Sequence, residues 1–224
     1  MLHCALAEWQ LARARLVRSR LGLWLLLLVG GVLLVARHPV VMAVDVGMLA
    51  AVLAVAFTAG ADSDRAALAL TLTHRTSPVA VALGRWLAAS AVAAICVGIA
   101  CGVRAGVGAS DALALWRAAA GGVAAAGATA ACTLALVWVG GNGLAGVFFL
   151  YVFVISRFGP PALAALFGER LPGTLVSVVV ETLPAVWRYA RLAAGDAAAW
   201  THVTAWAAGG VSVAALVLAR RSRQ

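Results

Sequence analysis

The chain has 224 residues, of which 64% are hydrophobic and only 11% are charged, and its mean hydropathy is +1.02. Soluble domains average about 45–50% apolar and about 25% charged residues, so the composition excludes an ordinary soluble protein. It indicates an integral membrane protein of the all-α class, because a helix satisfies all its backbone hydrogen bonds within lipid. The formal net charge is +9, and all 17 basic residues are arginine.

The absence of lysine excludes several chemistries. A P-loop needs a lysine on the nucleotide phosphates, and retinal or pyridoxal Schiff bases need a lysine amine. If ATP drives this protein, another polypeptide must bind the ATP. The arginines lie at the ends of apolar runs, where they are typical of topology signals. We therefore expect anionic lipids as their counter-charge, and no nucleic acid as a partner.

Six apolar runs are candidate membrane spans, since about 20 apolar residues in a helix cross a bilayer core of about 30 Å. The long uncharged run over 118–156 would be nearly twice the core thickness as one helix, so it must fold back, and Gly140-Gly141-Asn142-Gly143 is the natural turn. The expected spans are 21–36, 40–61, 79–103, 118–139, 144–165 and 197–219. They form a single transmembrane domain over 1–224.

The arginines also predict the orientation of the chain. Six spans place both termini on one side, and that side carries more arginines than the other. By the positive-inside rule, both termini are expected in the cytoplasm, with the protein in a bacterial inner membrane.

Three further segments do not span. Residues 2–20 can form an amphipathic helix at the cytoplasmic interface, although an ordinary basic flank would look similar. Residues 64–77 are too polar to cross and can form a short cytoplasmic helix. At its end Ser77 is placed to cap the third span and Pro78 to occupy its first turn, while Arg85 can snorkel to the near surface.

The segment 166–192 is expected on the outer side as a re-entrant or interfacial hairpin. Phe158-Gly159-Pro160-Pro161 breaks the preceding helix, and the apolar run between Glu169 and Glu181 is too short to cross. Pro184 interrupts the chain again. Backbone left unpaired at that depth must be buried or line a wet cavity, so the segment is a candidate gate.

Besides Arg85, two charges lie within the expected spans, where ionisable residues are functional candidates by default. Asp45 can pair with Arg37 or with an arginine of the outer segment. Arg157 can snorkel outward, pair with Glu169 or Glu181, or meet an anionic headgroup. The cysteines and histidines show no metal-ligand spacing, and we expect neither a metal nor a cofactor on this chain.

A local match to a known family is found in the first cytoplasmic connection. Its sequence is Asp64-Arg65-Ala66-Ala67-Leu68-Ala69-Leu70-Thr71-Leu72-Thr73, followed by Thr76-Ser77-Pro78 and Gly84-Arg85. This pattern resembles the coupling segment of the membrane subunits of ABC-2 type exporters. The stretch from Leu183-Pro184 through Arg191-Leu192 to Gly195 is similar to that family's outer segment before the last span, and the layout of the whole chain resembles the family as well.

The resemblance implies a non-catalytic permease that works as a homodimer or heterodimer. A separate nucleotide-binding subunit would hold ATP and Mg²⁺, and its closure would move a hydrophobic or amphipathic substrate outward. The implied coupling residues are Asp64, Arg65, Leu68, Leu70, Leu72, Arg75 and Ser77. The size also resembles the haem-exporter permease of cytochrome c maturation, and a non-transporting scaffold or sensor subunit would share the topology. A membrane enzyme is disfavoured, because the chain has neither GxSxG nor HExxH.

Overall fold

A computed structural model describes residues 6, 10, 14, 20–59, 77–108, 111–167 and 171–221, which form helices joined by short turns, with no strand among them. The helices are α2 (Leu21–Val35), α3 (Pro39–Ala59), α5 (Pro78–Gly106), α6 (Ala112–Gly140), α7 (Asn142–Phe153), α8 (Pro160–Phe167), α9 (Leu171–Thr182), α10 (Val186–Tyr189) and α11 (Ala197–Arg221), with 3₁₀ turns η2 (Ile155–Arg157) and η3 (Leu192–Ala194). The all-α class is confirmed for this part of the chain.

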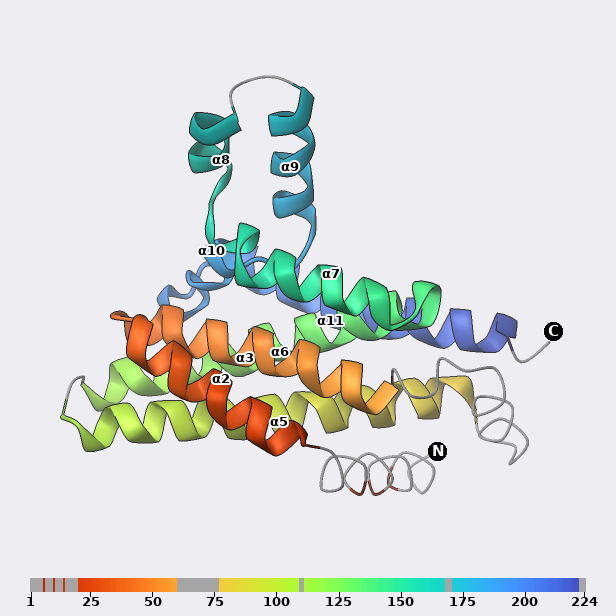
Figure 1. The fold of residues 1–224 in the computed structure, drawn as a ribbon, viewed down its shortest axis with the longest axis horizontal. Coiled ribbons are helices and arrows are strands. Elements are labelled where there is room, and N and C mark those ends of the chain that lie inside the picture. The colour runs from red at the N-terminus through yellow and green to blue at the C-terminus, as the bar shows by residue number, and fades with distance from the viewer. Residues whose placement is uncertain are drawn as a thin grey trace.

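The helices α2, α3, α5, α6, α7 and α11 form a bundle along one long axis, with alternating direction (Figure 1). Four of them, α3, α5, α6 and α11, are long and apolar enough to cross a membrane. The chain is therefore a helical membrane protein. The other two are apolar but short, with 15 residues in α2 and 12 in α7. The six-span topology stays a prediction.

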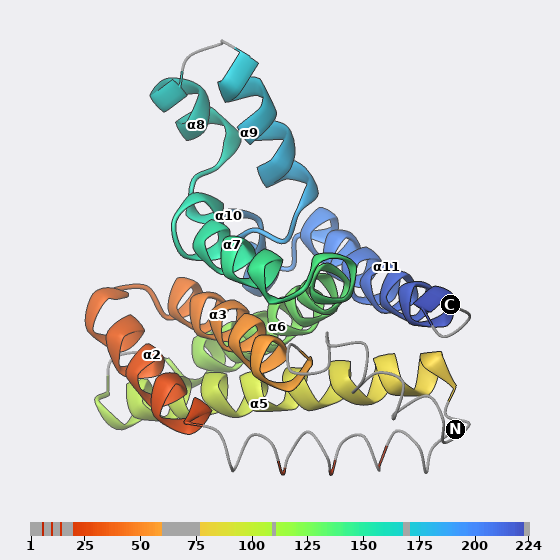
Figure 2. The same cartoon turned by 45° about the vertical axis from the view of Figure 1, so that its right-hand side comes forward.

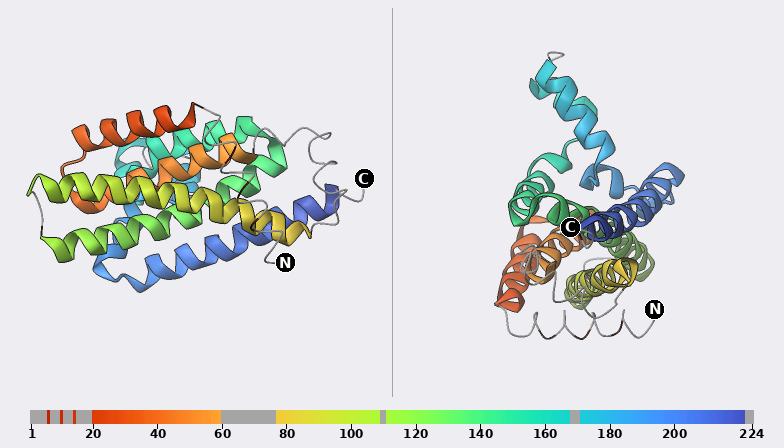
Figure 3. Two further views of the ribbon diagram at one scale, coloured as in Figure 1. Left: turned by 90° about the horizontal axis from the view of Figure 1, so that it is seen from below. Right: turned by 90° about the vertical axis from the view of Figure 1, so that its right-hand side faces the viewer.

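The centre of the bundle is the contact between α3 and α6, with α5 and α11 packed around it (Figure 3). Small residues allow this close approach. A methyl group on Gly122 of α6 would lie 2.6 Å from the Ala43 carbonyl oxygen of α3, and one on Gly210 of α11 would lie 2.7 Å from the Ala131 carbonyl carbon of α6. The small residues of α6 therefore pack on helices of the same chain.

Two predictions are confirmed, a turn at Gly141 and a helix start at Pro78. The chain reverses between α6 and α7 at Gly141, whose φ of +78° lies in the left-handed region that favours glycine. Helix α5 begins at Pro78, and the backbone of Ser77 before it is extended. The Ser77 side chain makes no capping hydrogen bond.

The fifth expected span, 144–165, is wrong as a single helix. Helix α7 ends at Phe153, and a 3₁₀ turn leads to α8, which begins at Pro160. Consecutive prolines lack backbone N–H groups, and a proline disfavours helical backbone at the residue before it, so the helix cannot continue through Gly159-Pro160-Pro161. The hairpin expected over 166–192 therefore starts at residue 160.

Helices α8 and α9 pack on each other and project sideways from the bundle (Figures 1 and 2). Several apolar side chains of this hairpin are exposed, among them Leu166, Leu175 and Val178. The chain then returns to the bundle through Pro184, which is buried, and through α10.

The snorkelling expected for Arg85 is also wrong. Its residue surface is only 3% exposed, and its guanidinium carbon lies 5.8 Å from the ring centroid of Trp138, a fully buried residue of α6. A cation over an indole face is stabilised electrostatically when both are removed from solvent. The aromatic partner keeps this arginine inside the bundle.

Two expected segments fall outside the described residues. Of the interfacial helix over 2–20, only residues 6, 10, 14 and 20 are described, and of the coupling segment over 64–77, only Ser77 is.

Candidate functional site

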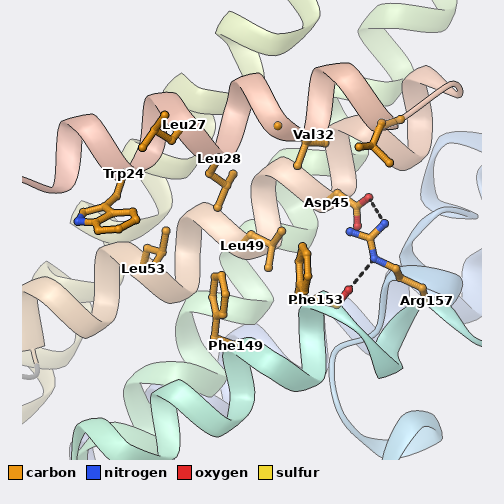
Figure 4. Close-up of a pocket in the computed structure, with 13 residues that line it drawn as sticks. Trp24, Leu27, Leu28, Val32, Asp45, Leu49, Leu53, Phe149, Phe153 and Arg157 are labelled. Carbon is orange, nitrogen blue, oxygen red and sulfur yellow. Dashed lines mark hydrogen bonds and ion pairs between the residues drawn. The ribbon is translucent and has the colours of Figure 1, made fainter.

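A cavity of about 760 Å³ lies between α2, α3 and α7 (Figure 4). Small-molecule sites typically measure about 300–1,000 Å³. The lining residues are Trp24, Leu27, Leu28, Gly31, Val32, Val35, Ala36, Asp45, Leu49, Leu53, Phe149, Phe153 and Arg157. All except the acid and the arginine present apolar surface, and we call this cavity the α2/α3/α7 groove.

Two rows of side chains at four-residue spacing define the groove. The rows are Asp45, Leu49 and Leu53 on α3, and Phe149, Phe153 and Arg157 on α7 and η2. Four-residue spacing keeps side chains on one face of a helix. The charged residues of both rows lie at the same end of the groove, and Trp24 lies at the other end (Figure 4). The groove is therefore apolar along its length and polar at one end.

The polar end is an ion pair between two helices. Nη1 of Arg157 lies 3.0 Å from Oδ2 of Asp45. The Nε–H of Arg157 donates to the Phe153 carbonyl oxygen at 2.8 Å, and the guanidinium carbon lies 5.6 Å from the centroid of the Phe153 ring. These contacts fix the guanidinium against the end of α7 while it reaches α3.

The two partners of this pair differ in accessibility. The Asp45 side chain is 1% exposed and that of Arg157 is 34% exposed. Both carboxylate oxygens of Asp45 are buried, and neither accepts a hydrogen bond of good geometry from the part of the chain that the structure describes, so the contact with Arg157 is an ion pair. A group that enters the groove therefore reaches the guanidinium first.

This pairing corrects the sequence-based expectations. Asp45 pairs with Arg157 and not with Arg37, and Arg157 forms no ion pair with Glu181 among the described contacts. The 3₁₀ turn after α7 directs Arg157 back toward α3, whereas Glu181 stands at the end of α9, next to α11, and is exposed. Glu169 lies outside the described residues.

Of the remaining predicted site residues, Ser77 and Pro184 are described and do not line this groove. The coupling residues Asp64, Arg65, Leu68, Leu70, Leu72 and Arg75 lie outside the described residues, and Ser77 stands at the start of α5. Pro184 is buried in the connection between α9 and α10. Among the predicted site residues that the structure describes, Asp45 and Arg157 are the two brought into contact.

A polar cluster at the base of the α8–α9 hairpin was not predicted from the sequence. The carbonyl oxygen of Thr182, at the end of α9, accepts from Nε2 of His202 at 3.0 Å and from Nε1 of Trp206 at 2.7 Å. With Nε2 protonated, Nδ1 accepts from the hydroxyl of Tyr189 at 3.1 Å. Burial raises the pKa of Tyr189, which keeps this hydroxyl protonated as a donor. The only sequence signal was the spacing of His202 and Trp206 on one helix face.

The described residues offer no group of three or more His, Cys, Asp or Glu side chains that could hold a metal ion. Cys96, Cys101 and Cys132 are buried free thiols.

Comparisons of the chain with protein families, with curated proteins and with solved structures give no match. Its function must therefore be inferred from its own residues and their geometry.

Proposed function

We propose that this chain is the membrane-spanning permease of an ABC-2 type exporter, in which a separate subunit hydrolyses ATP. The observation that carries the proposal is the α2/α3/α7 groove, which is apolar along its length and polar at one end, in a chain of membrane-length helices. A cavity of this kind suits a hydrophobic or amphipathic compound. The chain itself is then a non-catalytic subunit without a bound cofactor.

The coupling to ATP is supported by the sequence. The chain has no lysine for a P-loop, and its 64–77 segment resembles the segment with which ABC-2 permeases contact their nucleotide-binding subunit. We expect that subunit to bind ATP and Mg²⁺, and the permease to act as a homodimer or heterodimer.

The proposed topology has six spans in a bacterial inner membrane with both termini in the cytoplasm. The alternating direction of the bundle helices supports it, and the arginine distribution supports the orientation. Alkaline phosphatase fused after Gly108, between α5 and α6, is expected to be active, and a fusion after Arg221 to be inactive. The reverse pattern, or two active fusions, would contradict this topology.

The central test is recovery of the ATPase. A tagged full-length chain purified in mild detergent is expected to bring down a protein with a GxxxxGK[ST] motif and ATPase activity. Replacing Leu68, Leu70 and Leu72 together by glutamate is expected to abolish its recovery, because charge on an apolar docking surface must be desolvated.

A matched variant controls for general damage. Replacing the same three leucines by methionine conserves volume and apolar character and is expected to retain the ATPase. Recovery of the ATPase with the glutamate variant at the wild-type level, or no ATPase with any variant, would overturn the proposed function.

A further inference from the structure

We infer that the α2/α3/α7 groove binds an alkyl-chain amphiphile with an anionic, phosphate-type head. The alkyl chain of the ligand lies along the two apolar rows, and its head binds Arg157 at the polar end. As a statement about the exported substrate the inference rests on the proposed function, whereas the binding itself needs no ATPase.

The length of the groove fits an alkyl chain. Its lining on α2 extends from Trp24 to Ala36. At a rise of 1.5 Å per residue this is about 18 Å, and half of a bilayer core measures about 15 Å. Leu28 and Leu49 face the aromatic rings of Phe149 and Phe153 across the cavity (Figure 4). One chain of a membrane amphiphile can therefore be enclosed over most of its length.

The charge of the head follows from the unequal exposure of the ion pair. The carboxylate of Asp45 is occluded, whereas about a third of the Arg157 side chain is open to a ligand. A guanidinium carries five N–H groups, and Asp45 and Phe153 engage only two of them among the described contacts. The remaining donors can hold the oxygens of a phosphate in a forked arrangement.

A cationic head is disfavoured by the same geometry. It would meet the guanidinium before the carboxylate, and like charges repel strongly where water is scarce. The Asp45 carboxylate is buried behind Arg157 and is held to it by the ion pair, so it is not the group that a ligand head meets. Asp45 thus holds Arg157 in place and leaves its outer N–H groups for the anion.

Photo-crosslinking of the full-length protein in a neutral detergent tests this inference. The probe is hexadecyl phosphate with a diazirine in its chain, and the crosslinked peptides are mapped by mass spectrometry. Crosslinks are expected on α2, α3 and α7. Unlabelled hexadecyl phosphate should compete at least tenfold better than hexadecyltrimethylammonium, which has the same chain and the opposite charge.

Two kinds of variant test binding of the alkyl chain and binding of the anionic head separately. Leu28→Trp fills the groove and should abolish crosslinking there, while Leu26→Trp, at an exposed position of α2 outside the lining, should leave it unchanged. The double variant Asp45→Asn with Arg157→Gln keeps the end of the groove polar and neutral. It should weaken probe binding roughly tenfold or more, the size expected when charge-assisted hydrogen bonds are lost.

The source of the amphiphile is distinguished by a second probe. Phosphatidic acid with the same diazirine in one acyl chain is offered in nanodiscs. If it labels the groove, the occupant is a bilayer lipid, and if only hexadecyl phosphate labels it, the occupant is a free single-chain amphiphile.

Three results would overturn the inference. They are equal competition by the two head charges, unchanged binding in the double variant, and crosslinks between two copies of the chain through groove residues, which would show that a second copy fills it. Labelling of the groove without recovery of an ATPase would overturn the proposed function and leave the inference standing.

Discussion

Gly122 of α6 lies so close to Ala43 of α3 that a methyl group on Gly122 would be 2.6 Å from the Ala43 carbonyl oxygen. Backbone atoms of a packed helix cannot move aside as a flexible side chain can. The contact therefore sets the distance between the two central helices.

Gly122→Ala is expected to lower the stability of the protein by about 1–3 kcal/mol, the usual cost of overpacking. The thermal unfolding midpoint in detergent is the measurement. Gly127→Ala on the same helix is the matched control, because its methyl group would meet only the Trp86 ring at 3.8 Å. Equal midpoints for the two variants would contradict the close contact.

The ion pair between Asp45 and Arg157 predicts non-additive mutations. Arg157→Gln leaves the buried Asp45 carboxylate without its counter-charge, and because the Arg157 side chain is 34% exposed we expect a cost below that of a fully buried pair, about 3–5 kcal/mol. The double variant Asp45→Asn with Arg157→Gln should recover most of that loss, since no buried charge remains. Unfolding midpoints of the single and double variants form a double-mutant cycle. Additive losses would show that the two side chains are not coupled.

The hydrogen bonds at Thr182 predict that α11 helps to hold the α8–α9 hairpin in place. Trp206→Phe removes one of the donors to the Thr182 carbonyl oxygen, at a net cost of about 1 kcal/mol. Hydrogen exchange of the peptides over 171–189 should become several-fold faster. Thr201→Ala is the control, because the Thr201 hydroxyl donates only to the Ala197 carbonyl oxygen of its own helix among the described contacts. Unchanged exchange in the Trp206 variant would contradict this role.

The turn between α6 and α7 predicts unequal effects of two neighbouring alanines. At Gly141, with φ at +78°, an alanine should cost about 1–2 kcal/mol, because its Cβ clashes with the backbone in the left-handed region. At Gly143 the backbone is helical and a methyl group meets no atom within 4 Å, so Gly143→Ala should be neutral or stabilising. Unfolding midpoints decide between these outcomes, and a neutral Gly141→Ala would contradict the turn geometry.

The sequence predicted those features that depend on local chemistry. Gly141 at a reversal and Pro78 at a helix start each act through the conformation of their own backbone. The predicted fifth span is too long, because apolar residues continue to position 165. Gly159-Pro160 nevertheless marks a break in the sequence.

The candidate site could be predicted only in part, since its parts come from distant segments. Asp45 and Arg157 were each recognised as unusual charges, but their pairing depends on the 3₁₀ turn that follows α7. The sequence near Arg85 favours an interfacial side chain, because its contact with Trp138 joins two distant helices and leaves no local pattern. Contacts of this kind are properties of the packed bundle.

The short helices α2 and α7 both border the groove, and their lengths have a consequence for the surrounding lipid. With 15 and 12 residues they measure about 22 Å and about 18 Å, less than the bilayer core of about 30 Å. Such hydrophobic mismatch is relieved when the bilayer thins next to the protein. The membrane should therefore be thinnest on the side where the groove opens.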